Sequence, residues 1–425
     1  MKVGIIGAGF GGLAAGYKLA KQGVGVTIFE ADDKPGGLAI GLESPKWEWS
    51  LEKHYHHWFT NDYAILALAG EMGHKVITVR PKTSTFIGGG IYQLDSPLSL
   101  LMFEKLSFWQ RLRTGLVLAY FKFTPSWRSL EGITAEKFLK KWNGERAWDV
   151  LWKPLFEKKF AKFAHEIPAA WFWARIKKRT SSLAYPEGGF LSFAQHLDKL
   201  IRQCHGNVLY KTPVESLSKD GNKFRVETGK HEYLFDKVIC TLPSSLFLKI
   251  AKGLPENYVE SLIELKGIGT VNLVLLLNKQ FLADGTYWLN VNPPHFPFLT
   301  VVEHTNFMNK KYYGDKHIVY IGNYLQSDHR YFKKEAVDLL RDFYPYLKTI
   351  NPKFDKDWIE SAYLFKAAFA QPIIPLNYSE KVPSFETPIS GLYLCNIQQV
   401  YPWDRGTNYA VENGERVADI IIKEG

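Results

Sequence analysis

A glycine-rich turn stands near the start of the chain between two apolar segments: Lys2-Val3-Gly4-Ile5-Ile6-Gly7-Ala8-Gly9-Phe10-Gly11-Gly12-Leu13. The apolar, partly β-branched run before the glycines predicts a strand, and the Leu and Ala residues at helical spacing behind them predict a helix. A second apolar run, residues 24–29, ends at Glu30. This order of strand, glycine turn, helix, strand and acid is typical of a dinucleotide-binding βαβ unit.

Each part of this pattern has a physical task. Gly7 permits the tight turn, Gly9 lets backbone N–H groups approach a pyrophosphate, and Gly12 lets the helix pack closely on the sheet. Glu30 is placed to accept hydrogen bonds from an adenosine ribose, and its charge disfavours a 2′-phosphate, so NADP is not expected here. The predicted nucleotide contacts from this unit are Gly7, Gly9, Phe10, Gly11, Gly12, Glu30 and Ala31.

A second glycine pair, Gly36-Gly37, follows Glu30 by a few residues and returns the chain toward the nucleotide. This extension resembles the FAD-binding half of the superfamily of amine oxidases, protoporphyrinogen oxidases and phytoene desaturases. The resemblance implies FAD, with contacts from Gly36, Gly37 and the residue after them, and from the backbone at Val214. The residue after the glycine pair is usually Arg or Lys in the superfamily, whereas this chain has Leu38. No Cys or His has the spacing of a flavin-linkage site, so we expect the FAD to be noncovalent.

The C-terminal part of the chain carries a second nucleotide-binding pattern, which consists of a strand, a loop and a helix. Residues 391–396 predict a strand, and residues 401–414 lead from a loop into a helix that runs to Ile422. The N–H groups of that helix start, at Thr407 and Asn408, can stabilise negative charge on the flavin N1 edge. In relatives the preceding loop carries the flavin pyrophosphate, which implies a similar task for Asp404 and Arg405. The strand ends Cys395-Asn396-Ile397 instead of the usual Ala-Gly-Asp or Ala-Gly-Glu, so the residue that contacts the pyrophosphate stays open.

Residues 52–59, 152–160 and 170–176 are similar to a narrower group, the bacterial and archaeal protoporphyrinogen-oxidase-like or amine-oxidase-like proteins. In that group the first of these segments passes the isoalloxazine, so His56 is a candidate catalytic residue. Tyr401 and Trp403 are candidate pocket walls because they precede the helix that contacts the flavin. Zinc binding by His54, His56 and His57 is the alternative, but extended backbone would point His56 and His57 to opposite faces. We therefore predict no metal.

These features predict an α/β fold with a discontinuous, Rossmann-like FAD-binding domain and a substrate domain that combines a mixed sheet with helices. The expected FAD-binding segments are 1–61, 185–245 and 385–425. Residues 62–184 are expected to form a helical substrate lobe, and residues 246–384 the sheet and helices of the substrate domain. A helix is expected from Lys334 to Leu347.

Composition and charge argue against a nucleic-acid-binding protein and against a membrane-spanning one. The net charge is +10, and the chain has 13 Trp, 22 Tyr and 28 Phe, but no nucleic-acid-binding motif accompanies the charge. Three scattered cysteines and an N-terminal core strand predict a cytoplasmic protein without a signal peptide. Residues 98–127 are too interrupted by charge to span a bilayer but could contact a membrane surface, and packing inside the substrate lobe is the alternative.

The function expected from this reading is an FAD-dependent oxidoreductase whose flavin accepts a hydride equivalent from a C–N or C–C bond. Its partner would be a small molecule, apolar or anionic, and Arg175 and Arg405 could bind an acidic group. Two alternatives remain open: a redox-neutral isomerase similar to UDP-galactopyranose mutase that uses reduced FAD, and a noncatalytic flavoprotein scaffold. The oligomeric state is not predicted.

Overall fold

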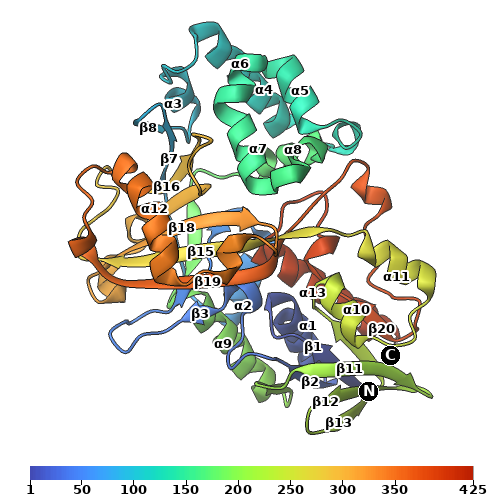
Figure 1. The fold of residues 1–425 in the computed structure, drawn as a ribbon. Helices are drawn as coiled ribbons and strands as arrows, with labels where there is room; N and C mark the ends of the chain where they lie inside the picture. Colours follow the sequence, from blue (N-terminus) through green and yellow to red (C-terminus); the bar gives the residue numbers. More distant parts are fainter. Residues whose placement is uncertain (425) are drawn as a thin grey trace.

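The computed structural model describes residues 1–424 and contains a five-stranded parallel sheet at the lower part of Figure 1. Its buried, β-branched strands suit a sheet covered on both faces. The order of strands is β10 (Asn207–Leu209), β2 (Gly25–Phe29), β1 (Lys2–Ile6), β14 (Lys237–Cys240) and β20 (Leu392–Leu394). Because three distant segments contribute these strands, the predicted discontinuous α/β fold is confirmed.

Two helices from opposite ends of the chain pack together beside this sheet. The helix α1 (Phe10–Lys21) lies against α13 (Thr407–Glu424), and Lys18 forms an ion pair of 2.7 Å with Asp419. A third helix, α9 (Gly189–Gln203), also contacts α1. The start of α1 and the start of α13 are therefore held in fixed positions relative to each other.

A seven-stranded mixed sheet crosses the middle of Figure 1. Its strands are antiparallel except for one parallel pair, β16 with β7. The helix α12 (Ala336–Ile350), close to the predicted 334–347, buries one face against it. In order the strands are β19 (Ile359–Pro372), β15 (Gly267–Leu277), β18 (His317–Leu325), β17 (Thr300–Glu303), β16 (Thr286–Val291), β7 (Lys82–Ile87) and β8 (Gly90–Gln93).

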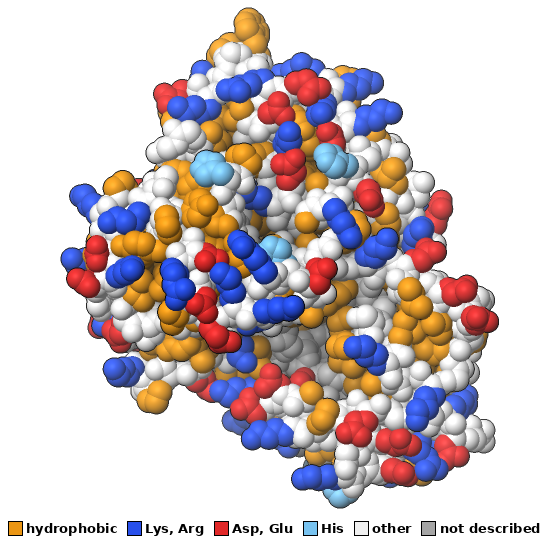
Figure 2. Space-filling model, viewed as in Figure 1, with side chains coloured by type: hydrophobic (Ala, Val, Ile, Leu, Met, Phe, Trp, Pro, Cys, Tyr) orange, Lys and Arg blue, Asp and Glu red, His pale blue; other side chains and the backbone are white. Residues whose placement is uncertain are grey.

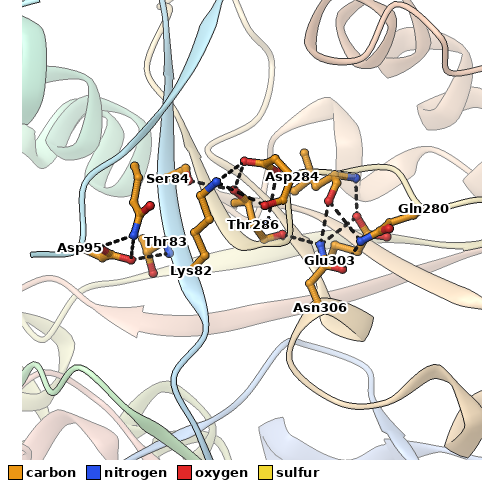
Figure 3. Close-up of polar contacts among 11 residues, drawn as sticks. Lys82, Thr83, Ser84, Asp95, Gln280, Asp284, Thr286, Glu303 and Asn306 are labelled. Carbon is orange, nitrogen blue, oxygen red and sulfur yellow. Dashed lines mark hydrogen bonds and ion pairs between the residues drawn. The ribbon is translucent and has the colours of Figure 1, made fainter. Parts of the chain in front are cut away.

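The hairpin of β7 and β8 departs from the sequence prediction, which assigned residues 62–184 to a helical lobe. Gly88 and Gly89 both have positive φ, 56° and 79°, which suits a two-residue hairpin turn. Figure 3 shows how polar side chains tie β7 to the rest of the sheet: Lys82 Nζ lies 2.7 Å from Asp284 Oδ2, and the hydroxyls of Ser84 and Thr286 are 2.8 Å apart. The hairpin therefore belongs to the seven-stranded sheet.

A helical lobe stands above this sheet in Figure 1. Ser107 and Gln110 form a capping box that starts α4, and aromatic rings fill the centre of the lobe. Lys158 donates hydrogen bonds to the carbonyls of Val291, Pro293 and Phe298 and so ties the lobe to the sheet. The main helices are α3 (Pro97–Leu101), α4 (Phe108–Phe123), α5 (Ala135–Asn143), α6 (Glu145–Ala147), α7 (Lys153–Phe160) and α8 (Ala169–Lys178).

Smaller elements complete the described residues. A three-stranded antiparallel meander lies near the parallel sheet, and a second three-stranded sheet supports the segment around Trp58. Within residues 1–424, no helix has both the length and the apolar character needed to cross a membrane. These elements are β11 (Val214–Asp220), β12 (Lys223–Thr228), β13 (Glu232–Phe235), β5 (Trp58–Phe59), β9 (Leu183–Pro186), β6 (Val76–Val79), β3 (Gly41–Leu42), β4 (Leu51–Glu52), α2 (Tyr63–Met72), α10 (Ser244–Ile250) and α11 (Glu256–Ile263).

Candidate active site

A cavity of about 1160 Å³ extends from the glycine turn to the helical lobe and the seven-stranded sheet. Figure 2 shows the molecule hollowed near its centre, with Lys and Arg side chains around the hollow. Most of the predicted cofactor contacts line this cavity: Gly7, Gly9, Phe10, Gly11, Glu30, Gly36, Gly37, Leu38, Asp404, Arg405 and Thr407. The two ends of the chain therefore meet at one space, as their motifs require.

The glycine turn forms a cradle that fits a pyrophosphate. A Cβ on Gly9 would have only Gly37 Cα near it, at 3.8 Å, so its backbone is open to the cavity. Gly36 donates its N–H to the carbonyl of Ala8 at 2.9 Å, which holds the second glycine pair against the first turn. The start of α1 faces this cradle with free N–H groups, a suitable environment for phosphate oxygens.

Glu30 lies at the end of β2 beside this cradle. Its carboxylate accepts hydrogen bonds from the backbone N–H groups of Ala8 at 2.8 Å and Asp32 at 2.9 Å. These bonds hold the side chain against the turn, while the residue still lines the cavity. The arrangement fits the predicted contact with a ribose.

Four of the predicted cofactor contacts lie outside the cavity lining. Gly12 packs against the turn, and Ala31 follows the end of β2. Val214 begins β11, and the buried Asn408 accepts a hydrogen bond of 3.1 Å from the N–H of Ile65. Gly12 and Asn408 thus have packing and anchoring contacts that account for their positions.

The His segment borders the cavity on the side of the mixed sheet. His56 and His57 both line it, contrary to the expectation that they point to opposite faces, because residues 53–57 do not form a strand. The three rings have separate partners: His54 Nδ1 lies 2.6 Å from the Asn272 amide, His56 Nδ1 2.6 Å from the His54 carbonyl, and His57 Nδ1 3.1 Å from the Tyr287 hydroxyl. Burial lowers the pKa of His56 to about 4, so its ring is neutral at pH 7.

The two predicted aromatic walls lie behind the cavity lining and not on it. The Tyr401 hydroxyl donates to Glu131 at 3.0 Å, and its ring packs edge-on against Trp127. Trp403 stacks on Tyr409, with ring centroids 6.3 Å apart, and Tyr409 itself lines the cavity. Trp403 can therefore influence the cavity only through its neighbours.

A buried charged cluster lies between the helical lobe and the loop before α13. Asp404 lies 3.3 Å from Lys159 Nζ and 3.9 Å from Arg175, and it also accepts from the Trp171 indole at 3.2 Å. Burial opposes ionisation of Asp404, but Lys159, Arg405 and Arg175 outweigh it and hold the pKa of this carboxyl below its usual range. Burial lowers the pKa of Lys159 to about 7 even beside this carboxylate.

Sequence reasoning did not identify Lys159 or Tyr324 as site residues. The available signal for Lys159 was its position between Phe156 and Phe160, where a lysine interrupts an apolar helix face. Tyr324 lies near the end of β18, and the sequence around it has no local pattern that distinguishes a cavity residue from a core residue. Its hydroxyl contacts the Arg405 guanidinium, and this pairing depends on the fold.

Comparison with known proteins agrees with this geometry. The family described as flavin containing amine oxidoreductase matches residues 10–422. The flavin-containing amine oxidase A of Canis lupus familiaris is 22% identical over 278 residues, 58% of this chain and 50% of that protein. The chain thus spans about half the length of this curated relative.

Two solved structures share the fold over nearly their whole length. Reduced UDP-galactopyranose mutase has a TM-score of 0.80 at 14% identity, covering 100% of this chain and 96% of that one. An oxidoreductase from Methanosarcina mazei has a TM-score of 0.77 at 18% identity, covering 99% and 100%. The family match confirms the predicted superfamily and its FAD cofactor: the chain belongs to the flavin containing amine oxidoreductase family.

Proposed function

We propose that the protein is an FAD-dependent oxidoreductase that removes a hydride equivalent from a C–N or C–C bond of a small molecule. The observation that carries this proposal is the single cavity that joins the glycine cradle, the start of α13 and a polar region beneath the helical lobe. The cavity lining continues from these two ends to the helical lobe and the seven-stranded sheet, which is where a substrate would lie beside the isoalloxazine.

The residues at the two ends of the cavity suit noncovalent FAD. Gly9 and Gly37 would face the pyrophosphate, Glu30 the ribose, and Thr407 at the start of α13 the N1 edge of the flavin. When bound, FAD supplies the hydride acceptor, and the protein orients it and the substrate.

His56 is the proposed catalytic residue among the three candidates. It lines the cavity, and the bond from its ring to the His54 carbonyl fixes its orientation. A neutral, oriented imidazole can accept a proton or a hydrogen bond from a substrate. Tyr401 and Trp403 are proposed to support the cavity wall from behind, Trp403 through Tyr409.

The proposal is tested with purified protein and a metabolite pool under anaerobic conditions. We expect a yellow protein that retains one FAD per chain and whose flavin absorbance is bleached by at least one fraction of the pool. Colourless protein that cannot be reconstituted with FAD would refute the cofactor site. FAD binding without bleaching by any fraction would refute the oxidase proposal.

A redox-neutral isomerase that uses reduced FAD is the second candidate. The observation that favours it is the excess of Lys and Arg over Asp and Glu in the cavity lining, which suits an anionic nucleotide sugar. Conversion of a substrate only after reduction of the flavin with dithionite, without net consumption of reductant, would favour this candidate over the oxidase.

We also propose that α3 and α4 contact a membrane surface. The outer face of α4 carries apolar residues four apart, from Phe108 through Leu112 and Leu116 to Tyr120, and its inner face buries Val117 and Phe121. Hydrophobic side chains also project at the top of Figure 2, near α3. Four basic residues and one acidic residue within 98–127 suit an anionic surface.

A further inference from the structure

The charges that line the cavity are unbalanced. Eight basic and five acidic side chains line the cavity. Glu30 lies at the end of β2 beside the glycine turn, at the opposite end of the cavity from the helical lobe, so it contributes little to the charge balance there. The basic residues are Arg80, Lys159, Arg175, Lys178, Arg179, Lys249, Lys266 and Arg405, and the acidic residues are Glu30, Asp62, Asp95, Asp328 and Asp404.

The excess of positive charge is concentrated around Asp404. Two cationic side chains lie against this one carboxylate, Lys159 at 3.3 Å and Arg175 at 3.9 Å. Arg405 donates its backbone N–H to Asp404 at 3.0 Å, while its guanidinium contacts Gln371 and Tyr324. The Trp171 indole and the Gln371 amide also donate to Asp404, at 3.2 and 3.3 Å. Asp404 carries a single negative charge, so it cannot balance Lys159, Arg175 and Arg405 together, and the cluster keeps a net positive charge.

The cations are held in place by aromatic rings and by the same Gln371 side-chain amide, whose oxygen accepts from Arg405. Lys159, whose side chain is only 5% exposed, lies 5.0 Å from the Trp171 ring and 5.3 Å from the Tyr324 ring. Arg405 donates to the Gln371 carbonyl oxygen at 2.8 Å and stands over the Tyr324 ring at 5.2 Å. Rings stabilise cations without neutralising them, so the cluster keeps its net positive charge.

The helical-lobe part of the cluster, Lys159 and Arg175, is separate from the glycine turn that suits the FAD phosphates. Lys159 and Arg175 lie on α7 and α8, above the mixed sheet in Figure 1, whereas α1 and its glycine turn lie below it. The pyrophosphate would be bound by the N–H groups at the start of α1. The cations of the helical lobe are thus available to a different anion.

We propose that Lys159, Arg175 and Arg405 form an anion-binding wall, and that the substrate carries a carboxylate or phosphate group and is not a free amine. This inference rests on the proposed function and specifies its substrate class. A cationic amine entering this wall would meet like charges in a region of low dielectric, whereas an anion would gain charge-assisted hydrogen bonds.

The proposal is tested by binding matched probes to the FAD-loaded protein: phenylacetate, phenethylamine and inorganic phosphate. Dissociation constants come from calorimetry and from shifts in the flavin absorbance, neither of which requires turnover. We expect phenylacetate to bind at least tenfold more tightly than phenethylamine, and its affinity to fall with added salt. The affinity of phosphate relative to phenylacetate shows which anion the wall prefers.

Three variants assign the effect to the wall. Arg175→Gln should weaken phenylacetate binding about tenfold, and Arg175→Lys should retain most of it. The matched control is Lys153→Gln, which removes an exposed charge from the same helix as Lys159 and should leave binding unchanged. All variants should retain FAD.

The proposal is overturned if phenethylamine binds as well as phenylacetate, if neither anion binds, or if Arg175→Gln has no effect. These outcomes leave the FAD-dependent oxidoreductase proposal standing when the protein is yellow and its flavin is bleached. If the protein does not bind FAD, the proposed function fails instead, and calorimetry with phenylacetate still tests the charge preference of the wall.

Discussion

The indole N–H of Trp58 donates a hydrogen bond of 2.9 Å to the hydroxyl of Thr407, which lies 349 residues later in the sequence. Trp58 is fully buried on β5, and Thr407 is the first residue of α13. The bond therefore fixes the helix start that faces the cavity. It couples the position of this helix to the packing of the N-terminal part of the chain.

We expect Trp58→Phe to weaken FAD binding by removing this bond while keeping an aromatic ring in the core. A lost neutral hydrogen bond costs about 0.5–1.5 kcal/mol, which corresponds to roughly two- to tenfold in affinity. Fluorescence titration of the apoprotein with FAD measures the effect. Thr407→Val, which removes the other partner, should give a similar change, and a dissociation constant equal to the wild type in both variants would contradict the role assigned to the bond.

Two glycines of the turn should respond differently to alanine. A Cβ at Gly12 would lie 2.0 Å from the Gly7 carbonyl oxygen, a clash that the backbone must move to relieve. At Gly9 the closest atom to such a Cβ is Gly37 Cα at 3.8 Å, and φ is −70°. We therefore expect Gly12→Ala to lower the melting temperature of the apoprotein, and Gly9→Ala to preserve it but lose FAD retention. Full FAD occupancy in Gly9→Ala would show that the pyrophosphate lies elsewhere.

Much of the domain built on the five-stranded parallel sheet could be predicted, because the sequence patterns that indicate it are local. The glycine turn and the acid at Glu30 each carry their own pattern, and the structure has β1, α1 and β2 at the predicted positions. The hairpin at 82–93 was missed because β7 is rich in Ser and Thr and β8 is only four residues long, so neither strand shows a strong alternation of apolar residues. The run Gly88-Gly89-Gly90 was the available turn signal.

The chemistry of the site was less accessible from the sequence. Asp404 was predicted as a cofactor contact, but its role as the shared partner of Lys159 and Arg175 depends on helices more than 200 residues away. Tyr401 and Trp403 were predicted as pocket walls from their position before α13, whereas their rings lie outside the cavity lining and pack against Trp127 and Trp173 of the helical lobe. Side-chain direction in an irregular loop has no periodicity from which it could be inferred.

Glu52 should make stability depend on pH. This fully buried carboxyl accepts hydrogen bonds from the Tyr185 hydroxyl and the Phe190 N–H, each at 2.9 Å, and burial raises its pKa to about 7. The folded state therefore binds more protons than the unfolded state between about pH 4.5 and 7. Its contribution, on the order of 3 kcal/mol, is present at low pH and lost as pH rises through about 7.

The Glu52→Gln variant isolates this contribution. We expect the urea midpoint of the wild type to fall between pH 5 and pH 8 by more than that of Glu52→Gln, because glutamine carries no titrating proton. The exposed Glu48→Gln is the matched control and should follow the wild type. Parallel pH dependence in all three proteins would mean that Glu52 does not titrate in this range.

The outer face of α4 should bind anionic vesicles. Trp109 and Phe123 are 74% and 80% exposed, and they lie fourteen residues apart on the same side of the helix as Leu116. Inserting such a ring into a membrane interface contributes about 1.5–3 kcal/mol, and each nearby Lys or Arg about 1 kcal/mol at an anionic surface. We expect co-sedimentation with phosphatidylserine-containing vesicles, weaker binding to phosphatidylcholine alone, and a decrease of at least about tenfold in Trp109→Ser/Phe123→Ser.

The matched control changes an exposed aromatic residue elsewhere. Tyr63→Ser, on α2, removes a ring that is 72% exposed and should not alter vesicle binding. The alternative is that a second copy of the chain covers this face of α4. Sedimentation velocity of the wild type and the double variant tests it by measuring the oligomeric state. A wild-type dimer that becomes monomeric in the double variant, together with no vesicle binding by either protein, would show that α4 forms a protein interface and not a membrane contact.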